Sequence, residues 1–182
     1  MHNAQNSDGS GAAIFGNGWT NPFDAHMAYN AATNVLSVYD IDGARYDWSS
    51  NGSGGWIPPA GMQGTTLTPT SSNCGYQWTK KNGTIYIFWA PFAACGTAAG
   101  YYGRLSAIYE RNWNNAITLT YNWTSNASTI ENIASIQVAN SDGHALTLTF
   151  ATYGSYAELS AITRPDGIVS QGVVYDPAGL LG

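Results

Sequence analysis

Residues 103–121 read GRLSAIYERNWNNAITLTY, and this stretch decides the fold. Apolar residues precede a polar bend at residues 110–115, and beyond the bend Ile117, Leu119 and Tyr121 alternate with threonine residues. Such alternation is typical of a strand with one face buried and the other in solvent. The stretch therefore predicts a strand, a turn and a second strand.

The same pattern occurs twice more downstream. Residues 133–150 (IASIQVANSDGHALTLTF) contain the turn Ser141-Asp142-Gly143, and residues 159–175 contain the turn Pro165-Asp166-Gly167. The steps between copies are unequal, and loops can absorb such differences. We therefore expect three degenerate repeats within residues 101–182. Equivalent apolar positions in the three copies are Ile108, Ile136 and Ile162.

Length and composition favour one folded, β-rich domain. The chain has 182 residues, of which 9% are charged and 13% aromatic, the reverse of the composition of disordered proteins. We expect residues 1–12 to be a disordered polar tail and residues 13–182 to form a single domain. Within that domain, N-terminal hairpins over 13–100 precede the repeats. The near-neutral composition favours a secreted or cell-surface location.

The distribution of charge disfavours two kinds of partner. The net charge of −5 comes from 11 acidic and 6 basic residues, and the basic residues are scattered rather than grouped in a stripe. A nucleic acid or an anionic membrane surface requires such a stripe. The sequence also has neither an apolar run long enough to cross a bilayer nor a charged and apolar leader after Met1. We therefore expect no nucleic-acid binding, no membrane insertion and no signal peptide in this segment.

Further hairpins are predicted in the N-terminal half, and helix is expected to be marginal. Residues 35–39 alternate and run into Asp-Gly at 42–43, and residues 75–79 run into Asn-Gly at 82–83, both of which favour tight hairpin turns. The apolar strand 84–89 is expected to be the most central, with both faces covered. Residues 56–61 (WIPPAG) should lie at an edge, because proline lacks an amide donor.

In chain order, these segments resemble the early part of a Rhs or YD-repeat protein. The resemblance covers about residues 14–182, and the ordered series is more specific than any one piece. A full repeat carries Tyr-Asp before a Gly-Arg-Leu unit, and only residues 175–180 approach it. The earlier copies have Tyr121-Asn122 and Phe150-Ala151 instead. The segments that carry the resemblance are FGNGWTNPF, VYDIDGARYDW, WIPPAG, YQWTKKNGTIYIF and GRLSAIYERNWNNAITLTY.

The resemblance implies an all-β fold of consecutive antiparallel β-hairpins that form a curved sheet, as a segment of a β-shell. In complete bacterial members such a shell encloses a C-terminal toxin, and insecticidal toxin complexes and teneurins use the same spiral. The implied function is that of a scaffold without catalysis, whose partners are the rest of the parent protein and its enclosed cargo. Because a hairpin fragment has open edges, self-association, or closure into a barrel or sandwich, is the alternative arrangement.

The sequence predicts no catalytic residue, cofactor or metal. Several of the acidic residues lie at predicted turns, where aspartate is favoured for local hydrogen bonds. His26 and His144 are far apart in the chain, and neither a nucleophile elbow nor a metalloprotease or phosphate-loop motif occurs. Asp40, Asp42 and Asp47 lack the ligand spacing of a calcium loop.

Carbohydrate binding by a secreted β-sandwich module is the competing function. The chain has 7 tryptophans, many for its length, and such modules stack sugars on exposed aromatic rings. The candidate stacking residues are Trp113, Trp123 and Trp56, the first two beside asparagine in or near predicted loops.

Cys74 and Cys95 are the only two cysteines and flank a predicted hairpin. They form either a disulfide or two free thiols, since the further cysteine and histidine ligands of a zinc site are missing.

Overall fold

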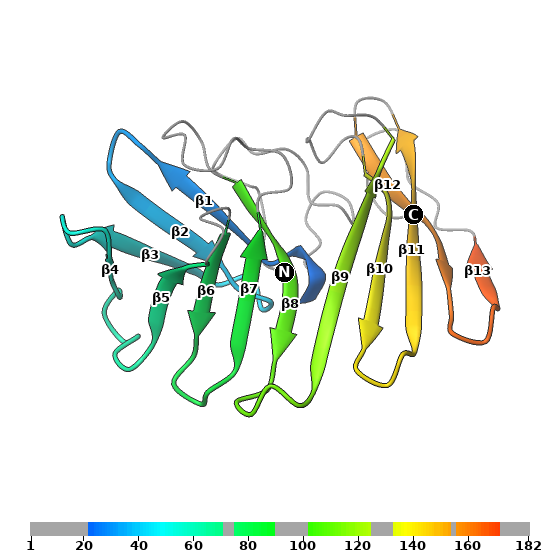
Figure 1. Ribbon diagram of the computed structural model, residues 1–182. Coiled ribbons are helices and arrows are strands. Elements are labelled where there is room, and N and C mark those ends of the chain that lie inside the picture. The colour runs from blue at the N-terminus through cyan, green and yellow to red at the C-terminus, as the bar shows by residue number, and fades with distance from the viewer. Residues whose placement is uncertain (1–21, 71–74, 90–101, 125–132, 154–155, 172–182) are drawn as a thin grey trace. The chain divides into compact units, whose positions relative to one another are not determined.

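The fold is all-β, as the sequence predicts. The computed structural model describes residues 22–70, 75–89, 102–124, 133–153 and 156–171 (Figure 1). These residues form thirteen strands, which pair in antiparallel fashion. Their one helical segment is the 3-10 turn η1 (Pro22–Asp24). The predicted disordered tail, 1–12, lies outside the described residues.

Backbone contacts divide the chain into two compact units. The N-terminal unit is Pro22–Ile117, and the C-terminal unit contains the described residues of Thr118–Gly182. The expectation of a single domain over residues 13–182 stays a prediction. The strands of the N-terminal unit are β1 (His26–Asn30), β2 (Val35–Tyr39), β3 (Arg45–Ser50), β4 (Trp56–Ile57), β5 (Thr66–Pro69), β6 (Gly75–Thr79), β7 (Ile85–Trp89) and β8 (Tyr102–Tyr109).

Two hairpin series meet in the N-terminal unit. Strands β1 to β4 pair in sequence order, and so do β5 to β8. The two series join where β1 pairs with β8, with Met27 opposite Gly103. The strand order is therefore β4-β3-β2-β1-β8-β7-β6-β5, and β4 and β5 are its two ends. Pairing between neighbours in the chain was expected, whereas the β1–β8 pairing was not.

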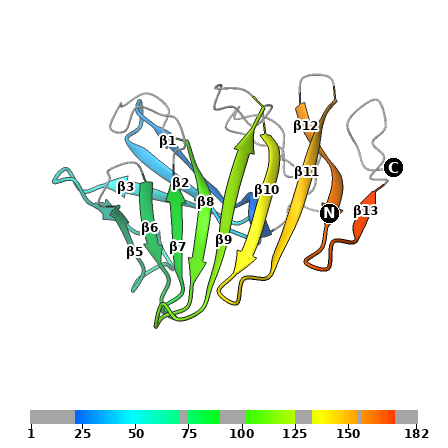
Figure 2. The same ribbon diagram turned by 45° about the vertical axis from the view of Figure 1, so that its right-hand side comes forward.

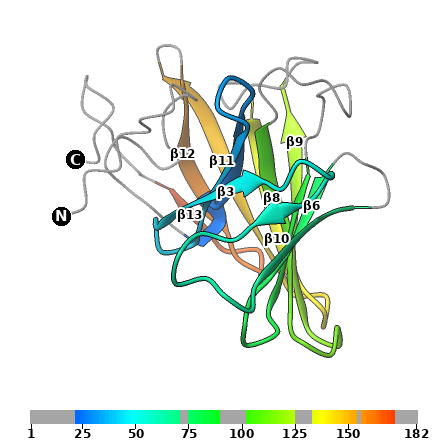
Figure 3. The same cartoon turned by 90° about the vertical axis from the view of Figure 1, so that its left-hand side faces the viewer.

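The sheet of the N-terminal unit curls so that β3 lies across β6 (Figure 3). Tyr46 on β3 and Trp78 on β6 bring their ring centroids to 5.8 Å, and the ring of Tyr86 on β7 is 5.4 Å from that of Trp78. Trp48, Trp78 and Phe88 are fully buried. These large side chains fill the space between the two hairpin series. Since the order ends at β4 and β5, the curl is not a closed barrel among the described residues.

Two predictions about particular strands in this unit have different outcomes. Trp56 and Ile57 form the short end strand β4, and the two prolines follow it outside the strand, which agrees with the expected edge position. The prediction for β7 is only partly right. Ile85 and Tyr86 are consecutive and both buried, so both faces are covered there, but Trp89 is 45% exposed. β7 also lies between β8 and β6 rather than at the middle of the strand order, because β1 joins on the far side of β8.

The C-terminal unit is a series of neighbouring hairpins (Figure 2). Leu148 pairs with Ile136 on one side and with Ile162 on the other, so two of the three positions expected to be equivalent flank the same strand. The predicted residues Val173 and Tyr175 lie outside the described residues. The strands are β9 (Ala116–Trp123), β10 (Ile133–Asn140), β11 (Ala145–Tyr153), β12 (Tyr156–Thr163) and β13 (Val169–Gln171). The first two residues of β9, Ala116 and Ile117, belong to the N-terminal unit. The buried apolar residues of this unit, among those described, are Leu119, Ile133, Ile136, Val138, Leu148, Phe150 and Leu159.

One turn geometry recurs after β2, β6, β10 and β12. In each turn the first residue accepts a backbone hydrogen bond from the fourth, a glycine, and donates one to the carbonyl of the fifth. The glycines have φ between 79° and 89°. This is the arrangement of a type I turn followed by a left-handed residue, a common hairpin connection. The four turns are residues 40–44, 80–84, 140–144 and 164–168.

A β-bulge also recurs, and the alternation of apolar residues does not predict it. Between β7 and β8 the register shifts at Ile87, and Ser106 donates a hydrogen bond of 3.1 Å to the Ile87 carbonyl. Between β11 and β12 it shifts at Thr149, and Ser160 donates one of 3.0 Å to the Thr149 carbonyl. Both serines stand in the same tetrapeptide, Leu-Ser-Ala-Ile. That identity is the signal from which the repeated bulge could have been found.

The recurring turn makes a prediction for glycine substitutions. Gly143→Ala should reduce the free energy of unfolding by about 1–2 kcal/mol, because alanine must adopt the left-handed backbone that glycine enters freely. No atom lies within 4 Å of the added Cβ, so steric overlap contributes nothing. Urea denaturation checks the value. A loss above about 3 kcal/mol would contradict the assignment of the effect to backbone conformation alone.

Candidate functional site

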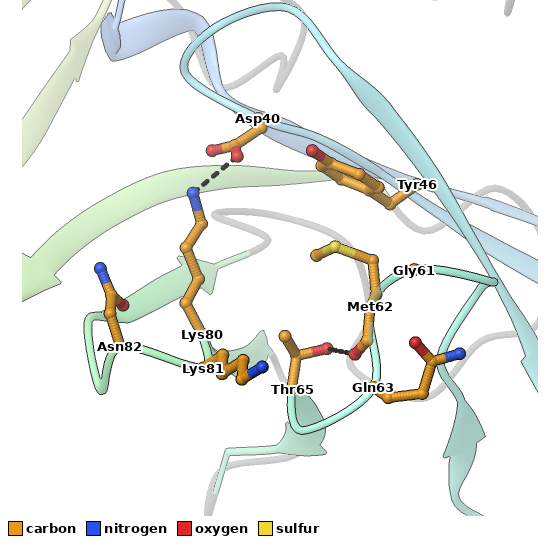
Figure 4. A pocket seen from close by; sticks show the side chains of 9 residues that line it. All are labelled: Asp40, Tyr46, Gly61, Met62, Gln63, Thr65, Lys80, Lys81 and Asn82. Carbon is orange, nitrogen blue, oxygen red and sulfur yellow. Dashed lines mark hydrogen bonds and ion pairs between the residues drawn. The ribbon is translucent and has the colours of Figure 1, made fainter.

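A pocket of about 310 Å³ opens at one end of the N-terminal unit. Figure 4 shows its walls, which come from the β2–β3 connection, the residues before β5 and the β6–β7 turn. The turn residue Asp40 accepts the backbone N–H of Ile41 at 2.8 Å, and Thr65 donates its hydroxyl to the Met62 carbonyl at 2.7 Å. Local hydrogen bonds of this kind hold the three connections in place.

The strongest electrostatic contact in the pocket joins two hairpin turns. Lys80 Nζ lies 2.6 Å from Asp40 Oδ2, and the side chains are 22% and 4% exposed, respectively. The same ammonium lies 4.7 Å from the ring centroid of Trp78 and 4.6 Å from that of Tyr86. Burial opposes the charge on Lys80, but the hydrogen bond and negative charge of Asp40 outweigh it, so the pKa of Lys80 is raised. Lys80 therefore stays protonated.

This arrangement favours a structural role for the pocket. A lysine acts as a nucleophile or base only when its amine is neutral, and the raised pKa of Lys80 works against that state. The carboxylate of Asp40 already accepts the ammonium and a backbone N–H, and the hydroxyl of Thr65 is already engaged. The pair ties the β2–β3 turn to the β6–β7 turn and so holds the two hairpin series together.

The Asp40–Lys80 pair and the neighbouring Tyr86 predict a loss of stability at high pH. The pKa of Lys80 is higher in the folded protein than its unfolded value of 10.5. The stability that this group contributes is therefore fully present below pH 10.5 and is lost as the pH rises through the folded pKa. Burial raises the pKa of Tyr86 as well, so ionisation of this tyrosine in the unfolded chain, above 10.0, favours unfolding. The free energy of unfolding should therefore fall above about pH 10. Urea denaturation at several pH values measures it, and Tyr86→Phe should weaken the decline. An unchanged slope in that variant would contradict the assignment.

A second group of ionisable side chains lies in the core. Arg104 Nη1 is 3.3 Å from Asp24 Oδ1, and His26 Nδ1 is 2.7 Å from the Asp24 backbone carbonyl. The His26 ring stacks on Tyr39 with centroids 4.3 Å apart. Burial raises the pKa of Asp24, an effect partly offset by the charges of Arg104 and His26. Arg104 and His26 are each only 5% exposed, so a substrate would have to displace core residues to reach them. The group is best understood as a structural one.

The three predicted stacking tryptophans have different environments. Trp56 has Tyr29 and Tyr76 as edge-on neighbours, each at 6.1 Å, and Trp123 stacks on Tyr121 at 6.0 Å. Both are half-buried. Trp113 is 50% exposed. The structure does not bring the three together into a single aromatic surface within either unit. A second tryptophan that is exposed among the described residues, Trp89, was missed, because its apolar strand predicted burial.

Trp113 also has an unusual backbone. Its N–H donates to the Glu110 carbonyl at 3.0 Å, which is the bond that the glycine makes in the four related turns. Its φ of 61° is in the left-handed region, where a residue other than glycine costs about 1–2 kcal/mol. The other such residue among those described is Asn34, at 53°, and asparagine tolerates this region. A tryptophan at this position is therefore strained.

The remaining predicted sites lie elsewhere or have no counterpart in the described residues. Cys74 and Cys95 are outside the described residues, so their pairing stays a prediction. Within the ranges that the structure describes, histidine, cysteine and acidic side chains form no group of three that could hold a metal ion. No helix in those ranges has the length and apolar character needed to cross a bilayer.

Comparison of the chain with models of known protein families gives no match, and comparison with curated proteins gives none either.

Proposed function

We propose that the chain is a non-catalytic scaffold, a segment of a Rhs or YD-repeat shell that encloses or presents a C-terminal effector. The observation that carries this proposal is the recurrence of one structural unit, a Leu-Ser-Ala-Ile bulge followed by a tight turn, at Ser106 and again at Ser160. A repeated unit that pairs with its neighbours in the chain is the usual basis of an extended architecture. Its partners would be the rest of a secreted or cell-surface parent protein and the cargo.

The bulges supply a physical reason for curvature. A bulge places two residues of one strand opposite one residue of its partner, which bends the strand and increases its twist. Each of the two bulges therefore introduces a bend into the sheet of its own unit. A curved wall is the form that a shell requires. The recurring bulge thus supports a shell segment more than it supports a flat binding module.

The last described strand, β13, supports the proposal further. Among the described residues, β12 pairs with β13 through Ala161, Ile162 and Thr163. Val169 on β13 is 47% exposed, and Ile168 in the preceding turn is 53% exposed. Exposed apolar residues on or beside an edge strand favour pairing with another strand. A further hairpin of the same kind would pair there and cover them.

Hydrogen exchange tests this proposal. The amides of β13, Val169–Gln171, should exchange at least about tenfold more slowly when the chain is extended by the residues that follow it in its gene, because a further hairpin covers the edge. The amides of β2, Val35–Tyr39, serve as an internal control and should not change. Equal exchange at β13 in the two proteins would overturn the proposal. Slow exchange of the β13 amides that appears in the present chain only when it dimerises at high concentration would also overturn the proposal.

A further inference from the structure

The indole of Trp113 is presented to solvent at the tip of the turn that follows β8. It is 50% exposed, and its ring centroid lies 4.6 Å from that of Tyr109, with the planes inclined by 41°. Tyr109 supports one side of the indole and fixes its orientation. A rigid, half-exposed aromatic ring results.

Folding alone does not favour tryptophan at this position. Glycine takes the equivalent place in the four related turns, at φ values between 79° and 89°, whereas Trp113 must be held at 61°. Tryptophan here is strained in its backbone and also exposes apolar surface to water. Residues that oppose the local preference of the chain tend to be functional. A partner outside this unit would account for both features.

The turn around the indole is rich in amides and carries one acidic and one basic side chain. Asn112 and Asn114 flank Trp113 and are exposed. Asn112 Oδ1 accepts a hydrogen bond of 3.1 Å from the backbone N–H of Asn114. Glu110 accepts a hydrogen bond from Asn115 Nδ2 at 2.8 Å. The side chain of Arg111 lies over the β6–β7 turn, 2.7 Å from the position that a Cβ added to Gly83 would take. Amide groups beside an aromatic ring provide both donors and acceptors for neutral hydroxyl groups.

We propose that Trp113 is the platform of a carbohydrate-binding site for neutral pyranose oligosaccharides. The C–H face of one pyranose ring would lie on the indole, and the side-chain amides of Asn112 and Asn114 would bond its hydroxyl groups. Tyr109 positions the indole from below. This is a function beyond that of a scaffold, and it does not depend on a shell.

The test is a titration of the whole chain with cellohexaose and, separately, with chitohexaose, followed by NMR. The indole N–H signal of Trp113, identified by its absence in Trp113→Gly, should shift together with the backbone amides of Asn112 and Asn114. A site with a single stacking ring should have a Kd of about 1 mM for at least one of the two sugars. Trp113→Gly should weaken binding at least tenfold.

Two variants separate binding from folding. Trp113→Gly relieves the backbone strain, so its thermal unfolding midpoint should stay within about 3 °C of the parent value, or rise. Trp89→Ala removes the other exposed indole of this unit, which has no left-handed backbone, and should bind the sugar as the parent chain does.

Several results would overturn the proposal. One is the absence of any shift at the Trp113 indole with either sugar at 10-fold the expected Kd. Another is unchanged sugar binding in Trp113→Gly. A third is a midpoint lowered by more than about 8 °C in that variant, which would make Trp113 a structural residue. If Trp113 becomes shielded only in the chain extended by its downstream residues, it is an intramolecular contact and not a sugar site.

Discussion

Gly75→Ala should destabilise the protein more than Gly143→Ala does, with a loss of about 3 kcal/mol or more in the free energy of unfolding. Gly75 is the first residue of β6 and lies opposite Trp89 of β7. A Cβ added there would be 2.1 Å from the backbone carbonyl oxygen of Phe88. Backbone cannot rotate away as a side chain can, so β6 must separate from β7 or shift in register.

Urea denaturation of both proteins measures the loss, and Gly143→Ala is the matched control. Both changes add one methyl group to a hairpin glycine, but the added Cβ at Gly143 has no atom within 4 Å, and Gly143 has a φ of 84° whereas Gly75 is not among the glycines with positive φ. Gly143→Ala therefore reports the cost of backbone conformation, and Gly75→Ala reports the steric overlap. A loss below about 1 kcal/mol in Gly75→Ala would mean that the Phe88 carbonyl leaves room for a Cβ at Gly75.

Lys80→Met should also be strongly destabilising, by about 3 kcal/mol. Methionine fills a similar volume, but it leaves the carboxylate of Asp40, 4% exposed, without its cation at 2.6 Å. A buried charge without a partner reduces the free energy of unfolding. The attraction of the ammonium to the rings of Trp78 and Tyr86 is lost as well. The reduced midpoint in urea at neutral pH measures the effect.

A double-mutant cycle shows whether the loss belongs to the pair. Asp40→Asn keeps an oxygen for the Ile41 N–H but removes the negative charge. In the protein that carries Asp40→Asn together with Lys80→Met, no buried carboxylate remains at this turn, so the combined loss should be smaller than the two single losses added together, by at least about 1.5 kcal/mol. Additive losses would show that the two side chains do not interact in solution.

Most of the strands and turns were predictable because they depend on residues close together in the chain. Val35–Tyr39 and Gly75–Thr79 carry the predicted strand pattern, and Asp-Gly or Asn-Gly follows each of them at a fixed offset. Alternation and turn chemistry act over a few residues, so they leave a readable signal. The bulge at Ser106 and Ser160 gave a weaker signal, because a single extra residue hardly disturbs the alternation.

The candidate sites were less predictable, for a related reason. Asp40 looks like an ordinary turn residue in the sequence, and nothing near it indicates a lysine partner forty positions away. Trp113, Trp123 and Trp56 look equally suited to stacking a ligand, yet Trp56 and Trp123 are half-buried beside other rings while Trp113 is exposed. Exposure depends on what packs against a side chain from other strands, and a local pattern does not contain that information.

The sequence by itself determined the all-β class, the alternating strands and the tight turns, since each of these is decided by residues within one hairpin. Tertiary structure alone decided which strands meet. It paired β1 with β8, placed β3 across β6, and brought Asp40 to Lys80. These contacts join segments far apart in the chain, and they form because the curled sheet buries Trp48, Trp78 and Phe88 together. Burial in a shared core is a property of the whole unit, and no single hairpin specifies it.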